Sequence, residues 1–139
     1  MITLKDYYMG RDEKYKTLLT PQLRANAALT VGAANLLLSA AASDGVYLEV
    51  HPVTRSLVSS GWRPPAVNAL TPGAAVRSKH MNCEAIDLYD SEGDLDAWCM
   101  DNLYKLEGFK LWLEHPGATK GWCHLQIIPP RSGNRVYYP

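Results

Sequence analysis

Four residues of this chain, two histidines, one aspartate and one glutamate, have the side chains that metal-dependent hydrolysis needs. His80 and Asp87 lie in one short segment, and Glu114 and His124 lie further along the chain. If His80, Asp87 and His124 meet in space, their two imidazoles and one carboxylate form the ligand set of a catalytic zinc with a fourth position open to water. Glu114 could then serve as the general base of a metal-dependent hydrolase.

Each of these residues also has a purely structural interpretation. His80 and Asp87 are seven residues apart, an odd spacing that places them on opposite faces of a regular strand, so they can share a metal only if a turn intervenes. Without that turn they are a surface histidine and a solvated aspartate. His124 is then a core histidine in an apolar strand, and Glu114 is a solvated carboxylate at the end of another strand.

A hairpin would bring Glu114 and His124 together. A turn around residues 118–120 would place them opposite each other on one face of two paired strands. A pairing shifted by one residue would place them on opposite faces. A cysteine hydrolase that uses Cys83 or Cys123 is a further alternative, but no Cys-His arrangement is indicated beyond the residues that the metal site already explains.

The composition is that of one globular domain, residues 1–139. The chain has 139 residues, of which 47% are hydrophobic and 20% are charged, as in an ordinary soluble core and surface. Its 14 basic and 14 acidic residues cancel, so no overall positive charge attracts nucleic acid or an anionic membrane. We therefore expect no nucleic-acid partner. We also expect the protein to be a monomer.

The cysteines and the N-terminal segment indicate a protein that folds in the cytosol. The three cysteines, Cys83, Cys99 and Cys123, form no C-x-x-C pair, and an odd number cannot all be bridged within the chain. Residues 1–16 are charged and rich in tyrosine, without the apolar core of a secretory signal. The expected location is therefore the cytoplasm, until another factor delivers the protein elsewhere.

Local patterns predict an α+β domain with a small antiparallel sheet and flanking helices. Thr20 and Pro21 begin a helix whose apolar residues recur at helical spacing until Asp44 and Gly45. Polar residues within its apolar run argue against membrane insertion. A second helix is predicted over residues 94–106. Strands are predicted over residues 46–50, 54–62, 84–89, 109–114 and 122–128, with irregular segments over 63–77 and after 128.

Several short motifs, taken in order, resemble a known enzyme family. They are Ser59-Ser60-Gly61-Trp62-Arg63-Pro64, then Asn68, then Ser78-Lys79-His80 with Ala85 and Asp87, and finally Trp122-Cys123-His124. Together they resemble the zinc D-alanyl-D-alanine carboxypeptidase family, which includes phage L-alanyl-D-glutamate endolysins and shares its fold with the hedgehog signalling domain. The likeness spans roughly residues 46–128.

The resemblance implies a function, a cofactor and a set of site residues. It implies a zinc peptidase that cleaves the stem peptides of peptidoglycan, as a phage-type endolysin released to the cell wall, a virion-borne wall enzyme or a carboxypeptidase. His80, Asp87 and His124 would be the zinc ligands. Arg63 and Ser78 would face the substrate. Asn68 and His115 are further candidates for substrate binding, and the alternative for Asn68 is that it only shapes its loop.

Two positions depart from the family pattern. Cys83 stands where the family commonly has glycine, and Gly121 stands where many members carry the catalytic acid, three residues before the last histidine. Some related members place a glutamate on the preceding strand instead, and Glu114 fits that pattern, so Glu114 is the predicted base, with His115 and Glu84 as the alternatives. The departures leave a second possibility open, a catalytically inactive module of the same fold that binds zinc or the cell wall or serves as a structural part of a virion.

Overall fold

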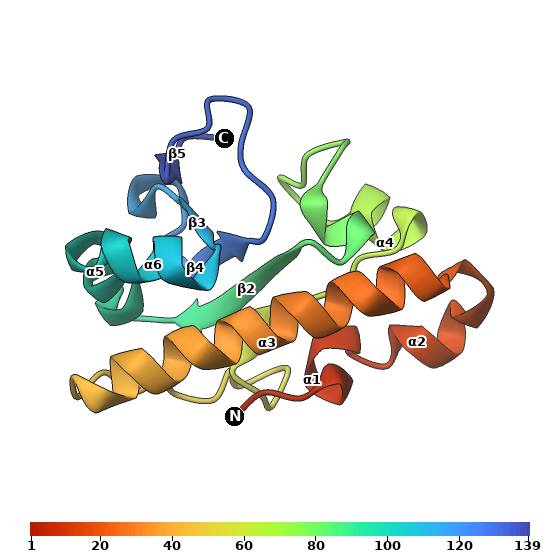
Figure 1. Cartoon of the computed structure of the whole chain (residues 1–139). Coiled ribbons are helices and arrows are strands. Elements are labelled where there is room, and N and C mark those ends of the chain that lie inside the picture. The colour runs from red at the N-terminus through yellow and green to blue at the C-terminus, as the bar shows by residue number, and fades with distance from the viewer.

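A five-stranded sheet with the strand order β1-β2-β4-β3-β5 runs through the protein (Figure 1). The computed structural model describes residues 1–139, and its strands are β1 (Val58–Ser60), β2 (Ala85–Asp90), β3 (Trp112–Glu114), β4 (Gly121–Gln126) and β5 (Val136–Tyr137). Neighbouring strands are antiparallel except β3 and β5, which are parallel. The predicted α+β class is confirmed, and the sheet is antiparallel over its first four strands.

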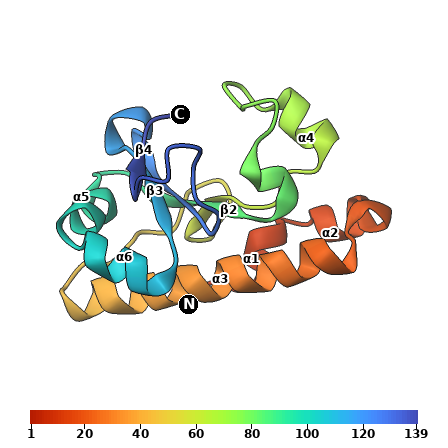
Figure 2. The same cartoon turned by 45° about the horizontal axis from the view of Figure 1, so that its top comes forward.

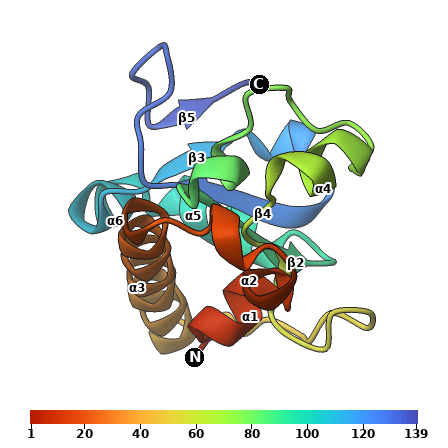
Figure 3. The same ribbon diagram turned by 90° about the vertical axis from the view of Figure 1, so that its right-hand side faces the viewer.

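Most of the helices lie on one side of this sheet. The α-helices are α1 (Leu4–Tyr8), α2 (Arg11–Lys14), α3 (Pro21–Ser43), α4 (Pro65–Leu70), α5 (Asp94–Asp101) and α6 (Leu103–Phe109). Three short 3-10 helices are η1 (Lys16–Leu18), η2 (Lys79–Asn82) and η3 (Pro116–Ala118). Figure 3 shows α1, α2 and α3 on one side of the sheet and α4 on the other. In Figure 2, α6 lies against the C-terminal part of α3, with which it is in contact.

Alternation along the central strands separates a core face from a polar face. Ile86 and Leu88 of β2 and Leu125 of β4 are fully buried, and they join one hydrophobic core with residues of α1, α3, α5 and α6. Because successive residues of a strand point to opposite faces, Asp87 and His124 lie on the face away from this core. Helices α1, α3, α5 and α6 therefore pack on the core face of the sheet and leave its polar face available for a site.

Helix α3 begins and ends where its sequence predicts. The hydroxyl of Thr20 accepts a hydrogen bond from the backbone N–H of Leu23 (3.2 Å), and Pro21 occupies the first turn. By length and a mean hydropathy of 1.4 this helix is apolar enough to cross a membrane, and 33% of its most apolar window is buried inside the protein. Thr30 donates a hydrogen bond to the carbonyl oxygen of Cys83 (2.7 Å), so the buried side of α3 is fastened to the segment before β2.

Two strand predictions before β2 are wrong or too long. Residues 46–50 form no strand, and only Val58–Ser60 of the predicted strand 54–62 pairs with β2. The backbone N–H of Arg55 donates to the carbonyl of His51 (2.9 Å), which closes a turn in the middle of the predicted run. Residues 46–50 pair with no strand, and the outer edge of β1 stays unpaired.

The helix predictions after β1 also need correction. The predicted irregular segment 63–77 contains α4, which begins at Pro65 because proline's fixed φ suits a first helical turn. The predicted helix 94–106 is two helices, α5 and α6, divided at Asn102, whose side-chain amide donates to the carbonyl of Trp98 (2.8 Å). Helix α6 runs on to Phe109, so β3 begins at Trp112 and not at residue 109.

The C-terminal tail is not wholly irregular. Val136 and Tyr137 form β5, which pairs with Leu113 and Glu114 of β3. A parallel edge strand of two residues has no local signal, because its partner lies more than twenty residues earlier and is reached only after an irregular excursion. This pairing adds one parallel pair to a sheet that is otherwise antiparallel, as predicted.

Candidate metal centre

The turn that His80 and Asp87 need in order to meet is supplied by η2. Ser78 caps this 3-10 helix by accepting a hydrogen bond from the backbone N–H of His80 (3.2 Å), and Cys83 ends it in a left-handed conformation with φ 57°. The chain then enters β2 and reaches Asp87. As a result, Nε2 of the buried His80 lies 3.3 Å from Oδ2 of Asp87.

His124 is brought to the same place by strand pairing. Asp87 of β2 and His124 of β4 are directly opposite each other in the antiparallel register. Their side chains point to the same face, and Nδ1 of His124 lies 2.6 Å from Oδ1 of Asp87. Each of His80, Asp87 and His124 thus offers one possible ligand atom, and these atoms all lie within 4.8 Å of one another.

The hairpin between β3 and β4 has the register that places Glu114 beside His124. Trp112 pairs with Gln126 and Leu113 pairs with Leu125, so the next residues along the two strands are Glu114 and His124. Oε2 of Glu114 lies 3.9 Å from Nδ1 of His124. Of the two registers considered from the sequence, the structure has the one that puts both side chains on the same face.

The hydrogen bonds of His80 show that its Nε2 is suited to hold a cation. Nδ1 of His80 lies 2.8 Å from the carbonyl oxygen of Gly61, which can only accept, so Nδ1 carries the proton and Nε2 carries the lone pair. Nε2 is buried and has no hydrogen-bond partner. Burial lowers the pKa of His80, although Asp87 opposes this, so the neutral ring is favoured. A lone pair facing a carboxylate is repelled unless a cation lies between them.

The other ionisable groups of the site are tuned by burial and by one another. Burial alone would raise the pKa of Asp87, but the attraction of His80 and His124 outweighs it and the pKa lies below its ordinary value. Burial would lower the pKa of His124, yet Asp87 and Glu114 raise it above its usual range. Burial raises the pKa of Glu114, with Asp87 adding to the rise and His124 opposing it. Asp87 is therefore ionised and able to serve as a ligand, whereas Glu114 accepts a proton more readily than an exposed carboxylate.

These observations fit a divalent metal of the zinc type. Two imidazole nitrogens and one carboxylate oxygen are ligands that zinc prefers, and three protein ligands leave a coordination position for a reactant. The carbonyl of Gly61 holds His80 in the orientation and tautomer that a ligand needs. Nε2 of His80 is buried without a hydrogen-bond partner, so its lone pair is free to bind a cation.

The three donors open into a cleft of about 550 Å³ that Arg63 and Ser78 also line. Nη2 of Arg63 donates a hydrogen bond to Oγ of Ser78 (3.0 Å), while Nε of Arg63 is buried without a partner. Arg77 and Lys79 line the same cleft and add positive charge beside it. A planar guanidinium and two further cations suit the carboxylates and carbonyls of a peptide.

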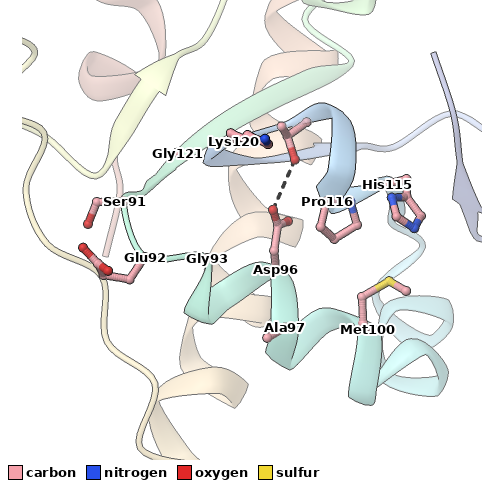
Figure 4. Close-up of a pocket in the computed structure, with 11 residues that line it drawn as sticks. Ser91, Glu92, Gly93, Asp96, Ala97, Met100, His115, Pro116, Lys120 and Gly121 are labelled. Atoms are coloured by element: carbon pink, nitrogen blue, oxygen red, sulfur yellow. Dashed lines mark hydrogen bonds between the residues drawn. The ribbon is translucent and has the colours of Figure 1, made fainter.

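Two of the residues predicted to bind substrate lie elsewhere. Asn68 is buried in α4, where its side-chain amide donates to the carbonyl of Ala75 (2.9 Å) and shapes the loop that leads to η2. His115 lines a separate pocket between α5 and the β3–β4 hairpin (Figure 4). There its ring stacks on Tyr138 at 4.4 Å between centroids, and its Nδ1 accepts from the backbone N–H of Gly117. Neither side chain lines the cleft of the metal donors.

The cleft also contains residues that the sequence motifs did not single out. Gln126 and Tyr137 line it beside the ligands. Gln126 is two residues after His124 on β4, so the two-residue period of a strand could have identified it as a neighbour on the same face. Tyr137 reaches the cleft only through the pairing of β5 with β3, for which the sequence holds no local signal.

The cysteines do not compete for this chemistry. Burial raises the pKa of Cys83 to about 12, so it remains a thiol and adds no thiolate near the metal donors. Cys123 is fully buried, faces the core side of β4 and has a pKa well above its ordinary value, mainly because of its hydrogen bond with Cys99 and because of burial. A cysteine nucleophile at either position is therefore disfavoured by burial and by protonation.

Comparison with known proteins identifies the family. A family model described as Peptidase M15 matches residues 47–125, a segment that contains all three metal donors and Glu114. No curated protein and no solved structure matches the chain significantly. Peptidases of this family depend on zinc, in agreement with the donor set that β2, β4 and η2 bring together. Since the matched segment is more than half of the 139 residues, the chain belongs to the peptidase M15 family.

Proposed function

We propose that this protein is a zinc-dependent peptidase that cleaves a peptide bond in the stem peptides of peptidoglycan, as a phage-type endolysin or a carboxypeptidase. The observation that carries the proposal is the group formed by His80, Asp87 and His124, whose ligand atoms lie within 4.8 Å of one another. Glu114 stands 3.9 Å from the ligand His124 in the same cleft. A metal-donor set beside a spare carboxylate is the equipment of metal-assisted hydrolysis.

In this proposal His80, Asp87 and His124 hold the metal, and Glu114 handles the proton. Zinc bound by such a set supplies a Lewis acid that polarises a carbonyl and makes water acidic enough to react near neutral pH. Glu114 takes the proton from the attacking water and later gives it to the leaving amine. Burial is the main cause of the raised pKa of Glu114. The raised pKa favours both transfers because it lies closer to neutral pH than that of an exposed carboxyl.

Arg63 and Ser78 orient the substrate. Arg63 is held by its hydrogen bond to Ser78, and its guanidinium retains unpaired N–H donors at the cleft. These donors suit a peptide carboxylate or the carbonyl that becomes an oxyanion during the reaction. Stem peptides carry free carboxylates, so the positive charges of Arg63, Arg77 and Lys79 support a substrate of this class.

A module that binds zinc or the cell wall without turnover is the competing proposal. Gly121 favours it, because this residue occupies the position at which many family members carry the catalytic acid. Gly121 begins β4 with φ 96° and has no side chain to contribute. The two proposals therefore differ on whether Glu114 replaces that acid.

One experiment separates these proposals. The protein is purified without added metal, its zinc content is measured, and release of new amino groups from purified peptidoglycan is followed with and without a chelator. Stoichiometric zinc with chelator-sensitive release supports the peptidase. Zinc without release supports the binding module, and absence of zinc overturns the peptidase and the zinc-binding form of the module.

Mass spectrometry of the released fragments would identify the bond that is cut. New N-termini within the stem peptide support an endopeptidase, whereas loss of a terminal residue supports a carboxypeptidase. The predicted location, cytoplasmic until release to the cell wall, stays a prediction, as does the monomeric state.

A further inference from the structure

The C-terminal segment, which lies beyond the family match at residues 47–125, contributes a side chain to the cleft. Strand β5 lies beside β3 (Figure 3), and Tyr137 of β5 is the registered partner of Glu114 in β3. The backbone N–H of His115 donates to the carbonyl of Tyr137 at 2.7 Å, which fixes this register. Arg135 fastens the strand further, since its guanidinium donates to the carbonyl of Leu111 (2.9 Å) and lies over the ring of Trp112.

Two consecutive hydrogen bonds fix the direction in which the Tyr137 hydroxyl donates its proton. The side-chain Nε2 of Gln126 donates to the carbonyl oxygen of Ile128 at 2.6 Å. The amide oxygen Oε1 of Gln126 therefore points away from Ile128 and towards Tyr137. That oxygen accepts the hydroxyl proton of Tyr137 at 2.7 Å. Because this hydroxyl proton is already used, the phenol oxygen of Tyr137 can only accept further hydrogen bonds.

This acceptor stands among the groups that are proposed to carry out hydrolysis. Tyr137 lines the same cleft as Glu114 and His124, and its ring centroid lies 6.5 Å from that of His124. Neighbouring residues of paired strands point to the same face, so the phenol and the carboxylate of Glu114 project side by side. A fixed acceptor beside a carboxyl that first takes and then gives a proton suits a nitrogen that donates its own N–H while it gains a second proton, as an amide that is becoming an amine does.

We infer that Tyr137 is a substrate-positioning residue whose phenol oxygen accepts a hydrogen bond from the nitrogen of the scissile peptide bond. This inference rests on the proposed peptidase function. Glu114 delivers the proton to that nitrogen, and Tyr137 holds the nitrogen in reach of Glu114. The role belongs to Tyr137 and not to Tyr138, a residue that is 71% exposed and whose ring stacks on His115 outside the cleft.

The test removes the hydroxyl alone. Tyr137→Phe keeps the ring, and Tyr138→Phe is the matched control in the next residue. With a peptide that the wild type cleaves, Tyr137→Phe is expected to lower kcat/KM about five- to tenfold, as loss of one ordinary hydrogen bond does, while Tyr138→Phe leaves it unchanged. Zinc content and thermal unfolding of both variants are measured to show that the fold and the metal centre remain.

A second substrate shows which atom Tyr137 contacts. In a depsipeptide analogue the scissile N–H is replaced by an ester oxygen, which has no proton to donate. The wild type and Tyr137→Phe are expected to cleave this ester with the same kcat/KM, because the hydrogen bond is absent in both. An equal loss on the amide and the ester, or no loss on the amide, overturns the inference.

Failure of the proposed function is distinguishable from failure of this inference. If the wild type releases no amino groups from any stem peptide, the peptidase proposal fails. The inference is then judged by the affinity of a synthetic stem peptide, followed through the fluorescence of Trp122, which lines the cleft. Weaker binding by Tyr137→Phe than by the wild type and Tyr138→Phe supports it, and equal binding or no binding overturns it.

Discussion

Nδ1 of His80 lies 2.8 Å from the carbonyl oxygen of Gly61, and Gly61 is itself pressed against the N-terminal helix. The backbone N–H of Trp62 donates to the carbonyl of Tyr7 at 3.1 Å. A Cβ on Gly61 would lie only 1.9 Å from that same carbonyl oxygen. The orientation of a metal donor therefore depends on residues of α1 that lie outside the family match.

Substituting Gly61→Ala is expected to damage both stability and metal binding. The new methyl group cannot fit against the backbone of Tyr7, so α1 or the Gly61 carbonyl must move. We expect a loss of about 1–3 kcal/mol in the free energy of unfolding and a weaker affinity for zinc, measured by denaturant titration and by competition with a chelator. The control is Gly108→Ala in α6, where a Cβ meets nothing within 4 Å. An affinity for zinc equal to that of the wild type would show that Gly61 does not orient His80.

Removing the buried histidine should remove the metal. His80→Ala deletes the only donor of the three that has an unpartnered buried nitrogen, and Asp87 and His124 alone hold zinc poorly. We expect the purified variant to contain far less zinc than the wild type by elemental analysis. His115→Ala is the control, because His115 lies outside the cleft and should leave the zinc content unchanged. Equal zinc in the wild type and His80→Ala would contradict the proposed ligand set.

Neutralising Glu114 should separate catalysis from metal binding. Glu114→Gln keeps the size of the side chain but cannot take up a proton, so kcat is expected to fall about 100-fold or more while zinc stays bound. The measurement is release of amino groups from peptidoglycan together with zinc content. Glu107→Gln, an exposed substitution on α6, should be as active as the wild type. Full turnover by Glu114→Gln would mean that another group is the base.

The buried carboxyl of Asp96 should make stability depend on pH. Oδ2 of Asp96 accepts a hydrogen bond from Thr119 (3.1 Å), Oδ1 has no partner, and burial raises the pKa to about 6. The folded state thus binds this proton more tightly than the unfolded chain, in which the pKa is about 4. Between those values the contribution of Asp96 to stability decreases as the pH rises, because burying the charged form becomes costly.

Asp96→Asn should remove this dependence. The variant is expected to melt a few degrees higher than the wild type at pH 7.5, with a smaller difference at pH 5, as followed by thermal unfolding. Because other groups also titrate in this range, the quantity to compare is the difference between variant and wild type at each pH. Asp101→Asn, an exposed substitution on α5, is the control. A difference that is the same at both pH values would contradict a raised pKa for Asp96.

Several elements could be predicted because their signals are local. The cap at Thr20, the proline at the first turn and the helical spacing of apolar residues define α3 within the chain itself. Two-residue alternation likewise indicates β2 and β4, and it places Asp87 and His124 away from the core. The same period could also have placed His115 correctly, since it follows Glu114 directly and adjacent residues of an extended segment point to opposite sides.

Other elements could not be predicted because their partners are distant. A strand is defined by its pairing with another strand, and local composition does not fix that pairing. The β-branched and aromatic residues of 46–50 pair with no strand, whereas two residues near the C-terminus pair with β3 and form β5. The sequence allows two registers of β3 against β4, and the register in the structure places Glu114 beside His124.

By itself the sequence determined which side chains are the candidates for the chemistry, because residue types and their order single out the possible donors His80, Asp87 and His124 and the carboxyl of Glu114. Only the tertiary structure decided how they are oriented and what accompanies them. The carbonyl of Gly61 fixes the ring of His80, and the hydroxyl of Tyr137 reaches the cleft through a strand that pairs across the sheet. Hydrogen bonds and pairings of this kind join residues far apart in the chain, so no local pattern records them.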